Sequence, residues 1–273
     1  MSYRSTTKAV ILARGLGTRM RAADASAELD AASAAVADSG VKAMIPVGRP
    51  FLDYVLSALA DAGFAEACLV IGPEHDAVRD YYEVKSPPSR IRARFAIQET
   101  PLGTADAVLA AEKFAVGGSF VVLNSDNYYP ASALAELQRR TEPAMVAFSR
   151  DSLTARGNVA AGKVSRFGAV EVDERGMLRR MTADPVSAAA STGGRVYASM
   201  NCWLFTAGIF DACRCVPVSS RGEKELTQAV QHAIDGRGME LEVVLSDEPV
   251  LDLSTRADIP RVTRFLEGID ARP

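Results

Sequence analysis

The chain has 273 residues, enough for one large domain or two small ones, and its 48% hydrophobic and 24% charged residues are typical of a globular protein. With 31 Lys and Arg residues against 34 Asp and Glu residues, the formal net charge is -3, which argues against binding to long nucleic acid. No apolar run reaches the roughly 20 residues that cross a membrane, and residues 1–8 lack a signal-peptide core, so we expect a cytoplasmic protein with no membrane partner.

In the first half of the chain, short apolar runs alternate with helical patterns. The runs at 9–13, 68–72, 95–98 and 120–123 predict strands, and the patterns at 50–62, 74–82 and 104–114 predict helices. This alternation predicts a mainly parallel sheet covered on both faces. The stretch 21–39 is rich in Ala, Asp and Ser, and its composition is compatible with either a helix or a flexible flap.

The second half has a different pattern. Strands are predicted at 164–172 and 176–182, joined by a turn at 173–176, and a longer strand at 195–205. These strands favour antiparallel pairing. The remaining predicted elements are helices at 207–215 and 223–234, a strand at 241–245 and a terminal helix at about 254–267.

Four cysteines and two histidines limit the available chemistry. No two cysteines form a C-x-x-C pair, and three of them lie in apolar segments, which favours reduced thiols in packing positions. Both histidines, His75 and His232, occupy sites typical of solvated helix positions. We therefore expect no multi-histidine metal centre and no histidine-based catalysis.

A glycine-containing loop follows the first strand and reads Leu-Ala-Arg-Gly-Leu-Gly-Thr-Arg-Met over residues 12–20. Two glycines one residue apart allow a tight turn that brings backbone N–H groups close to phosphate oxygens, and Arg19 adds charged donors. The loop fits a polyphosphate, although glycine is also common in any turn after a strand. Met20 stands where the dinucleotide pattern G-x-G-x-x-G needs its last glycine, and the Walker pattern is absent.

Residues 12–20, followed by Val-Lys-Ala-Met-Ile-Pro-Val at 41–47, resemble the opening of the sugar-phosphate nucleotidylyltransferases, the NDP-sugar pyrophosphorylase superfamily. Val41 stands where the second pattern of that family has a proline. Further blocks match in order at residues 98–107, 124–127, 167–170, 222–227 and 251–255. The resemblance spans nearly the whole chain.

The resemblance implies a Rossmann-like three-layer α/β/α fold with a mainly parallel mixed sheet and an inserted antiparallel β-hairpin region. It implies a single domain over residues 1–273, with a nucleotide-binding half at 1–150 and a sugar-phosphate-binding half at 151–273. The implied activity is the condensation of a nucleoside triphosphate with a sugar 1-phosphate to give an NDP-sugar and pyrophosphate. Relatives often form dimers or tetramers, so a homo-oligomer is possible.

The resemblance also assigns roles to individual residues. Arg19 would stabilise the departing pyrophosphate, Lys42 would neutralise charge near the α-phosphate, and Asp126 would act with Asp252 to hold Mg²⁺. Without the resemblance, a solvated loop lysine would be the better interpretation of Lys42, and the two aspartates could be turn or helix caps. The residues implied to contact the nucleotide are Leu12, Ala13, Gly15, Gly17, Thr18, Gln98, Gly103 and Thr104. Gln98 and the Gly-Thr backbone favour UTP or dTTP, but relatives that use other bases carry similar segments, so the base stays open.

The acceptor half departs from the family pattern. Gly168, Asp184 and Asn201 match sugar-phosphate positions, but Asp184 stands where many hexose-1-phosphate enzymes have a phosphate-binding lysine. Unless Lys163 or one of the arginines at 179 and 180 replaces that lysine, Asp184 would repel the acceptor phosphate. Arg14 likewise replaces a small residue of the loop.

Two alternatives to a hexose-1-phosphate enzyme follow from these departures. One is a non-catalytic regulatory protein that binds a nucleotide or an NDP-sugar. The other is a nucleotidylyltransferase with a non-hexose acceptor. The set Arg19, Lys42, Asp126 and Asp252 favours an active enzyme, because a decaying site usually loses its metal carboxylates as well.

Overall fold

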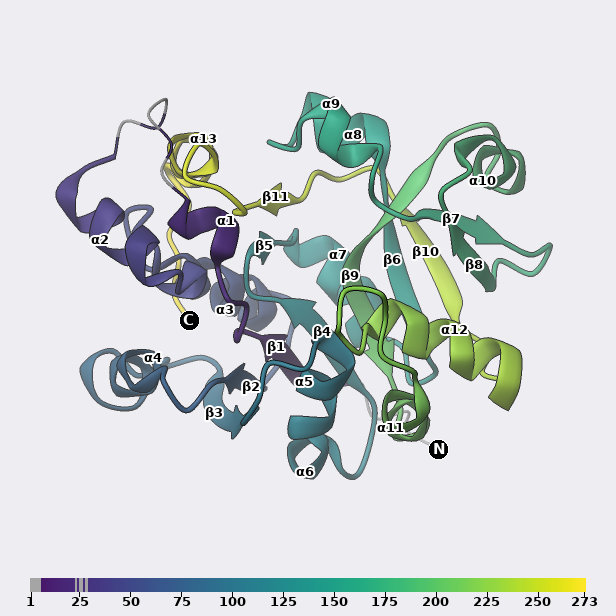
Figure 1. The fold of residues 1–273 in the computed structure, drawn as a ribbon, viewed down its shortest axis with the longest axis horizontal. Coiled ribbons are helices and arrows are strands. Elements are labelled where there is room, and N and C mark those ends of the chain that lie inside the picture. The colour runs from purple at the N-terminus through teal and green to yellow at the C-terminus, as the bar shows by residue number, and fades with distance from the viewer. Residues whose placement is uncertain (1–5, 23, 25–26, 28) are drawn as a thin grey trace.

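The computed structural model describes residues 6–22, 24, 27 and 29–273. A central mixed sheet is covered by helices on both faces (Figure 1). Along its main path the described strands follow the order β10-β6-β9-β4-β1-β2-β3. The predicted three-layer α/β/α class is therefore confirmed.

The first half of the chain forms the parallel side of the sheet. Its strands are β1 (Lys8–Leu12), β2 (Glu66–Ile71), β3 (Arg92–Ile97) and β4 (Phe120–Asn124). Strand β1 lies between β2 and β4, and Val10 is in register with Cys68 on one side and with Val122 on the other. Continuous apolar runs suit these central strands because both of their faces are buried.

The second half completes the sheet on the other side of β4. Strand β9 (Tyr197–Phe205) pairs antiparallel with both β4 and β6 (Ala144–Ser149), and β10 (Glu242–Ser246) pairs parallel with β6. Strands β7 (Ala169–Val172) and β8 (Leu178–Thr182) form the predicted hairpin, which joins the sheet through β9. The antiparallel insertion is confirmed.

One predicted strand begins too early. The pattern at 164–172 predicts extended backbone from Val164 onward, but Val164 ends the short helix α9 (Ala161–Val164). The backbone turns at this point, since the N–H of Phe167 donates to the carbonyl of Val164 at 3.1 Å. Val164 is buried as the last residue of α9. Its apolar side chain was therefore mistaken for the first buried residue of the strand.

The strands alternate their side chains between two hydrophobic cores, one on each face of the sheet. Ala9 and Ile11 pack on the face covered by α3 (Phe51–Asp61), α7 (Ala131–Gln138) and α13 (Asp258–Leu266). Val10 and Leu12 pack on the face covered by α5 (Thr104–Ala110), α11 (Gly208–Cys215) and α12 (Leu226–Arg237). This two-residue period is what a strand buried on both faces requires.

The smaller helices lie around this framework. They are α1 (Thr18–Arg21), α2 (Ala31–Ser39), α4 (Asp76–Asp80), α6 (Glu112–Ala115), α8 (Arg150–Ala155) and α10 (Pro185–Ser191), with a 3₁₀ turn at Lys42–Met44 and a π turn at Tyr81–Lys85. Helix α2 decides part of the open question about residues 21–39: Asp30 caps it by accepting from the N–H of Ser33 at 2.7 Å. Residues 23, 25, 26 and 28 of that stretch lie outside the described residues.

All four cysteines are free thiols, and Cys68, Cys202 and Cys213 are buried. Burial raises the pKa of Cys68 and of Cys213 to about 12 each, so both thiols stay protonated and act as apolar packing groups. Cys215 is exposed. His75 corrects a prediction: it is buried rather than solvated, with 8% of its surface exposed.

Within the described part of the chain, none of the helices is both long enough and apolar enough to cross a membrane.

Candidate active site

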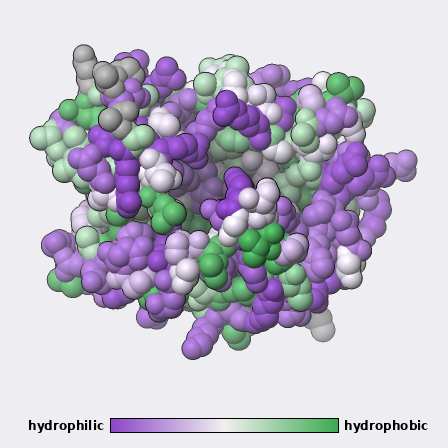
Figure 2. Space-filling view, in the orientation of Figure 1, coloured by the Kyte–Doolittle hydropathy of each residue, from purple (hydrophilic) through white to green (hydrophobic). Residues whose placement is uncertain are grey.

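Two cavities meet at the carboxyl end of β4, and both are lined by Asn124 and Asp126. The end of β4 lies beside the end of β1, where parallel sheets of this kind bind their ligands. Figure 2 shows a hollow near the middle of the face of the molecule that is in view. The first cavity has a volume of about 230 Å³ and the second about 350 Å³.

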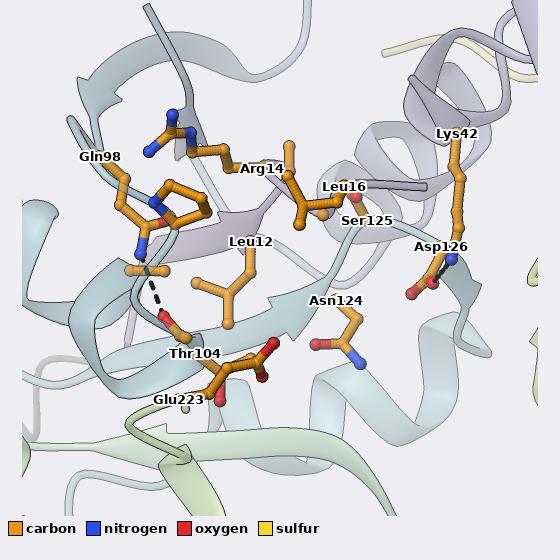
Figure 3. A pocket seen from close by; sticks show the side chains of 15 residues that line it. Leu12, Arg14, Leu16, Lys42, Gln98, Thr104, Asn124, Ser125, Asp126 and Glu223 are labelled. Atoms are coloured by element: carbon orange, nitrogen blue, oxygen red, sulfur yellow. Dashed lines mark hydrogen bonds and ion pairs between the residues drawn. The ribbon is translucent and has the colours of Figure 1, made fainter. Parts of the chain in front are cut away.

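The first cavity contains most of the predicted nucleotide residues (Figure 3). It is lined by Leu12, Ala13, Arg14, Gly15, Leu16, Lys42, Gln98, Pro101, Gly103, Thr104, Ala107, Asn124, Ser125, Asp126 and Glu223. Gly17 and Thr18, which were also predicted to bind the nucleotide, do not line it. The two glycines of the loop therefore have different environments.

Gly17 packs against Gly40 at the end of α2 and does not face the cavity. Its φ is 61°, and a Cβ added to it would lie 2.2 Å from the carbonyl oxygen of Gly40. The loop therefore packs directly against the end of α2, and only glycine fits there. Gly15, in contrast, lines the cavity, and a Cβ added to it would meet nothing within 4 Å.

Gln98 lies at one end of the first cavity, opposite Lys42 and Asp126 (Figure 3). Its Nε2 donates to the carbonyl of Gly103 at 3.0 Å and to the carboxylate of Asp106 at 2.8 Å. Both partners can only accept, so the amide orientation is fixed and Oε1 is the atom left to accept from a ligand. Gly103 has a φ of 111°, and a Cβ there would lie 2.5 Å from the carbonyl of Lys224.

Arg14 extends toward the same end of the cavity as Gln98 (Figure 3). Its side chain is only 7% exposed, and it pairs with Glu74 through Nη2 at 3.3 Å. Its Nη1 is buried and has no hydrogen-bond partner among the described residues. A charged donor without a partner is costly, so this end of the cavity suits a ligand that offers an acceptor.

Lys42 and Asp126 form an ion pair where the two cavities meet. Lys42 Nζ lies 2.7 Å from Asp126 Oδ2, and the side chains are 13% and 23% exposed. Lys42 reaches the site from the 3₁₀ turn, and Asp126 from the turn between β4 and β5. The sequence alone allowed two other interpretations, a solvated loop lysine for Lys42 and a turn or helix cap for Asp126. Neither of them includes this ion pair.

A pair of two-residue strands brings Asp252 next to Asp126. Strand β5 (Asn127–Tyr128) pairs antiparallel with β11 (Leu251–Asp252), with Asp252 opposite Asn127. The N–H of Leu253 also donates to the carbonyl of Asp126 at 2.8 Å. Asp252 thus belongs to a strand and does not cap α13.

The Asp252 carboxylate is held on both oxygens. Oδ1 accepts from the hydroxyl of Ser254 at 2.9 Å and from Asn127 Nδ2 at 3.3 Å. Oδ2 pairs with Lys163 Nζ. Burial is the main cause that lowers the pKa of Lys163, and the charges of Arg19 and Lys42 add to it.

The second cavity is rich in cationic side chains. It is lined by Arg19, Asn124, Asp126, Asn127, Lys163, Arg166, Phe167, Ser199, Met200, Asn201, Arg221, Asp252 and Ser254. Arg19, the predicted pyrophosphate residue, faces this cavity rather than the first. Four cations against two carboxylates make the cavity suitable for an anion.

Of the predicted acceptor residues, only Asn201 lines either cavity. It is the one non-glycine residue with positive φ in the described chain, at 55°, and its Oδ1 accepts from Trp203 Nε1 at 3.3 Å. Gly168 lies just outside, next to Phe167. Asp184 caps α10 by accepting from the N–H of Val186 at 2.9 Å.

The structure also identifies the cation nearest the second carboxylate. Lys163 lines the second cavity, whereas Arg179 and Arg180 pair with Glu171 on the hairpin. Among the three candidates to replace the missing lysine, only Lys163 is therefore in position. Arg166, one turn later, lines the same cavity and was not predicted, because its sequence context is that of an ordinary exposed turn.

The two carboxylates fit a hard divalent cation such as Mg²⁺. Each offers oxygen ligands: Asp252 lies on β11, and Asp126 directly precedes β5, the strand that pairs with β11. No cluster of three or more Asp, Glu, His or Cys side chains that could bind a metal occurs among the described residues. Mg²⁺ is usually bound by one or two carboxylates together with water and phosphate oxygens, so two carboxylates suffice.

Comparisons with known proteins find similarity along nearly the whole chain. A model of the family described as nucleotidyl transferase matches residues 8–267. The chain is 27% identical over 269 residues to a glucose-1-phosphate thymidylyltransferase of Streptomyces antibioticus, covering 97% of this chain and 68% of the relative. It is 25% identical over 257 residues to the UTP–glucose-1-phosphate uridylyltransferase AglF of Haloferax volcanii, covering 92% and 93%.

Two solved structures share the fold. One is a UDP-glucose pyrophosphorylase complexed with UDP-glucose, with a TM-score of 0.72 and 16% identity, covering 96% of this chain and 98% of the other. The second is the inositol-1-phosphate CTP transferase from T. maritima, with a TM-score of 0.69 and 17% identity, covering 97% and 98%.

Proposed function

The chain belongs to the nucleotidyl transferase family, and we propose that it condenses a nucleoside triphosphate with a sugar 1-phosphate to give an NDP-sugar and pyrophosphate. The observation that supports this most directly is the meeting of two cavities at Asp126. One cavity is formed by the glycine loop and Gln98, and the other is lined by cations. Two anions bound side by side would react at this point.

The reaction needs alignment and charge neutralisation more than acid–base chemistry. An oxygen of the acceptor phosphate forms a bond to the α-phosphorus, while the bond from that phosphorus to the bridging oxygen of the β-phosphate breaks. The bridging oxygen keeps the electron pair and leaves with pyrophosphate. Since the attacking oxygen is already ionised, no general base is required.

The cations of the site have separate tasks in this proposal. Lys42 neutralises charge near the α-phosphate, where the two cavities join. Arg19 stabilises the departing pyrophosphate, and Lys163 with Arg166 holds the acceptor phosphate in the second cavity. Asp126 and Asp252 would hold Mg²⁺, which when bound supplies charge neutralisation to the phosphates.

The choice of nucleotide rests on Gln98 and on the named relatives. The free Oε1 of Gln98 can accept from the N3–H of uracil or thymine, which favours UTP or dTTP. The relatives named above act, by their names, as thymidylyl- and uridylyltransferases of glucose 1-phosphate. These names support a hexose 1-phosphate as the acceptor.

A non-hexose acceptor is the second candidate. Two observations favour it: Asp184 caps a helix instead of binding phosphate, and Asn201 holds a left-handed backbone in the acceptor cavity. The non-catalytic alternative has less support, because Arg19, Lys42, Asp126 and Asp252 all line the cavities.

The test is pyrophosphate release with Mg²⁺ across a grid of nucleoside triphosphates and sugar or cyclitol 1-phosphates. Asp126→Asn is assayed beside wild type, with the exposed Asp151→Asn as a matched carboxylate control outside both cavities. We expect activity with UTP or dTTP that is lost in Asp126→Asn and kept in Asp151→Asn. Triphosphate binding without release from any pair would instead support the non-catalytic alternative.

A further inference from the structure

Asn158 lies in the segment that joins α8 to α9, and only 7% of its surface is exposed. Both of its side-chain hydrogen bonds go to the backbone of Asp252. Asn158 Nδ2 donates to the Asp252 carbonyl at 2.8 Å, and the Asp252 N–H donates to Asn158 Oδ1 at 2.8 Å. The orientation of the amide is fixed. If it were rotated by 180°, Nδ2 would face the Asp252 N–H and Oδ1 would face the Asp252 carbonyl.

The amide of Asn158 completes a strand that is otherwise very short. One edge of β11 pairs with β5, and just beyond the two strands the N–H of Leu253 donates to the carbonyl of Asp126. The N–H and C=O of Asp252 point to the opposite edge, where Asn158 takes the place of a neighbouring strand. A two-residue strand has few bonds of its own, so these two decide how firmly Asp252 is held.

The chain before Asn158 is shaped for this contact. A Cβ added to Gly157 would lie 2.6 Å from the carbonyl of Leu153 and 2.8 Å from that of Val250. A glycine is therefore needed for the segment to approach β11. The same segment continues into α9 and supplies Lys163, which pairs with the Asp252 carboxylate. One stretch of chain thus holds both the backbone and the side chain of Asp252.

We propose that Asn158 is a positioning residue that aims the Asp252 carboxylate at a divalent cation; this inference rests on the proposed function. Asn158 lines neither active-site cavity, so it acts only through Asp252. Asp252 Oδ1 is tied to Ser254 and Asn127, and these bonds have the right geometry only when the backbone of β11 is fixed. Loss of an outer contact of this kind typically weakens metal binding by about 10- to 100-fold.

The experiment compares Asn158→Ala with Ser57→Ala. Ser57 is a matched control: it is buried, its hydroxyl accepts from the backbone N–H of Arg272 at 3.0 Å, and it lines neither cavity. Binding of Mn²⁺ to the free protein is followed by electron paramagnetic resonance, and folding by thermal unfolding. We expect Asn158→Ala to raise the Mn²⁺ dissociation constant at least about tenfold and to lower kcat more than it changes KM, with Ser57→Ala close to wild type.

Asn158→Ser provides a second variant in case the alanine variant does not fold. Its hydroxyl is too short to reach both backbone atoms of Asp252, so weaker Mn²⁺ binding is expected here too. Equal binding by wild type and a folded Asn158 variant would overturn the inference, and so would unfolding of both variants, which would assign Asn158 to the fold alone. If wild type neither binds Mn²⁺ nor releases pyrophosphate with any substrate pair, the proposed function itself fails.

Discussion

Two lysines neutralise the two carboxylates of the site, each by direct contact. Lys42 pairs with Asp126 and Lys163 with Asp252. Burial lowers the pKa of Lys163, which means that its ammonium group has lost hydration and gains more from a nearby anion than an exposed lysine would. Lys163 would therefore be a strong contact for the acceptor phosphate that we propose binds in the second cavity.

We predict that Lys163→Ala raises the KM for the sugar 1-phosphate by about tenfold or more, because a charge-assisted hydrogen bond contributes about 1.5–3 kcal/mol. The KM for the nucleoside triphosphate should change much less, because Lys163 does not line the first cavity, in which we propose that the base and the α-phosphate bind. Steady-state kinetics with each substrate varied in turn measures both. Arg179→Ala, which removes a cation paired with Glu171, serves as the control. A similar rise in both KM values would contradict the assignment.

Among single residues, those inside the segments that match family patterns were the easiest to identify as site candidates. Lys42, Asp126 and Gln98 each lie in a block that matches a family pattern, and all three line the first cavity. Asn158 and Arg166 lie outside those blocks. Their contribution depends on how α9 approaches β11, and no local pattern in the sequence encodes that approach.

At the scale of elements, the strands with continuous apolar runs were predictable and the two-residue strands were not. Strands β1, β2 and β4 are buried on both faces, which leaves a strong signal in the sequence. The pairing of β5 with β11 joins segments more than a hundred residues apart, and two residues carry no periodicity. No element was predicted between residues 128 and 163, where α7, β6, α8 and most of α9 lie.

Gly15 and Gly17 of the glycine loop have different surroundings, so alanine should affect stability differently at the two positions. Gly17→Ala should lower the free energy of unfolding by at least about 2 kcal/mol, because its φ is positive and its Cβ would overlap Gly40. Gly15→Ala should change the free energy of unfolding by less than about 0.5 kcal/mol, because nothing lies within 4 Å of its Cβ. Urea unfolding of both variants measures the difference. Equal stability of the two would show that the loop does not pack on α2.

His75, which lies between β2 and α4, is expected to make the stability of the fold depend on pH. His75 Nδ1 accepts from the N–H of Gly72 at 3.3 Å, and protonation would remove that acceptor. Burial is the main cause that lowers the pKa of His75 below 6.5, Arg14 and Arg21 lower it further, and Glu74 opposes them. The unfolded chain then binds more protons than the folded one, so stability falls as the pH drops through 6.5 and levels off below the folded-state pKa.

We therefore expect the free energy of unfolding to decrease between about pH 7.5 and about pH 5.5, and His75→Gln to lose part of this decrease. Urea unfolding at the two pH values, in wild type and variant, is the measurement. His232→Gln, a change at an exposed helix position, is the matched control. An identical pH response in wild type and His75→Gln would remove His75 as the source.

At the scale of the whole molecule, the expected halves 1–150 and 151–273 are interleaved in the sheet. Strand β6 comes from the first half but lies between β9 and β10 of the second, and β9 lies between β4 and β6. Both cores also draw residues from both halves. The resemblance implied two consecutive halves, and the order of segments along the chain carries no information on which strands become neighbours.

This interleaving predicts that the chain unfolds as one cooperative unit. Calorimetric and van't Hoff enthalpies of unfolding should agree, and a fragment of residues 1–150 should not fold, because β6 would lose both of its neighbours. Differential scanning calorimetry of the chain and circular dichroism of the fragment test this. Two separate transitions, or a folded fragment, would show that the halves are independent domains.

The distribution of the thiols has a practical consequence for spectroscopy. Three cysteines are buried, and Cys215 at the end of α11 is exposed. A maleimide dye added to the native chain would therefore label one defined position without mutagenesis. Helix α11 packs against α5, which begins at the cavity residue Thr104, so the dye would be attached one helix away from the first cavity.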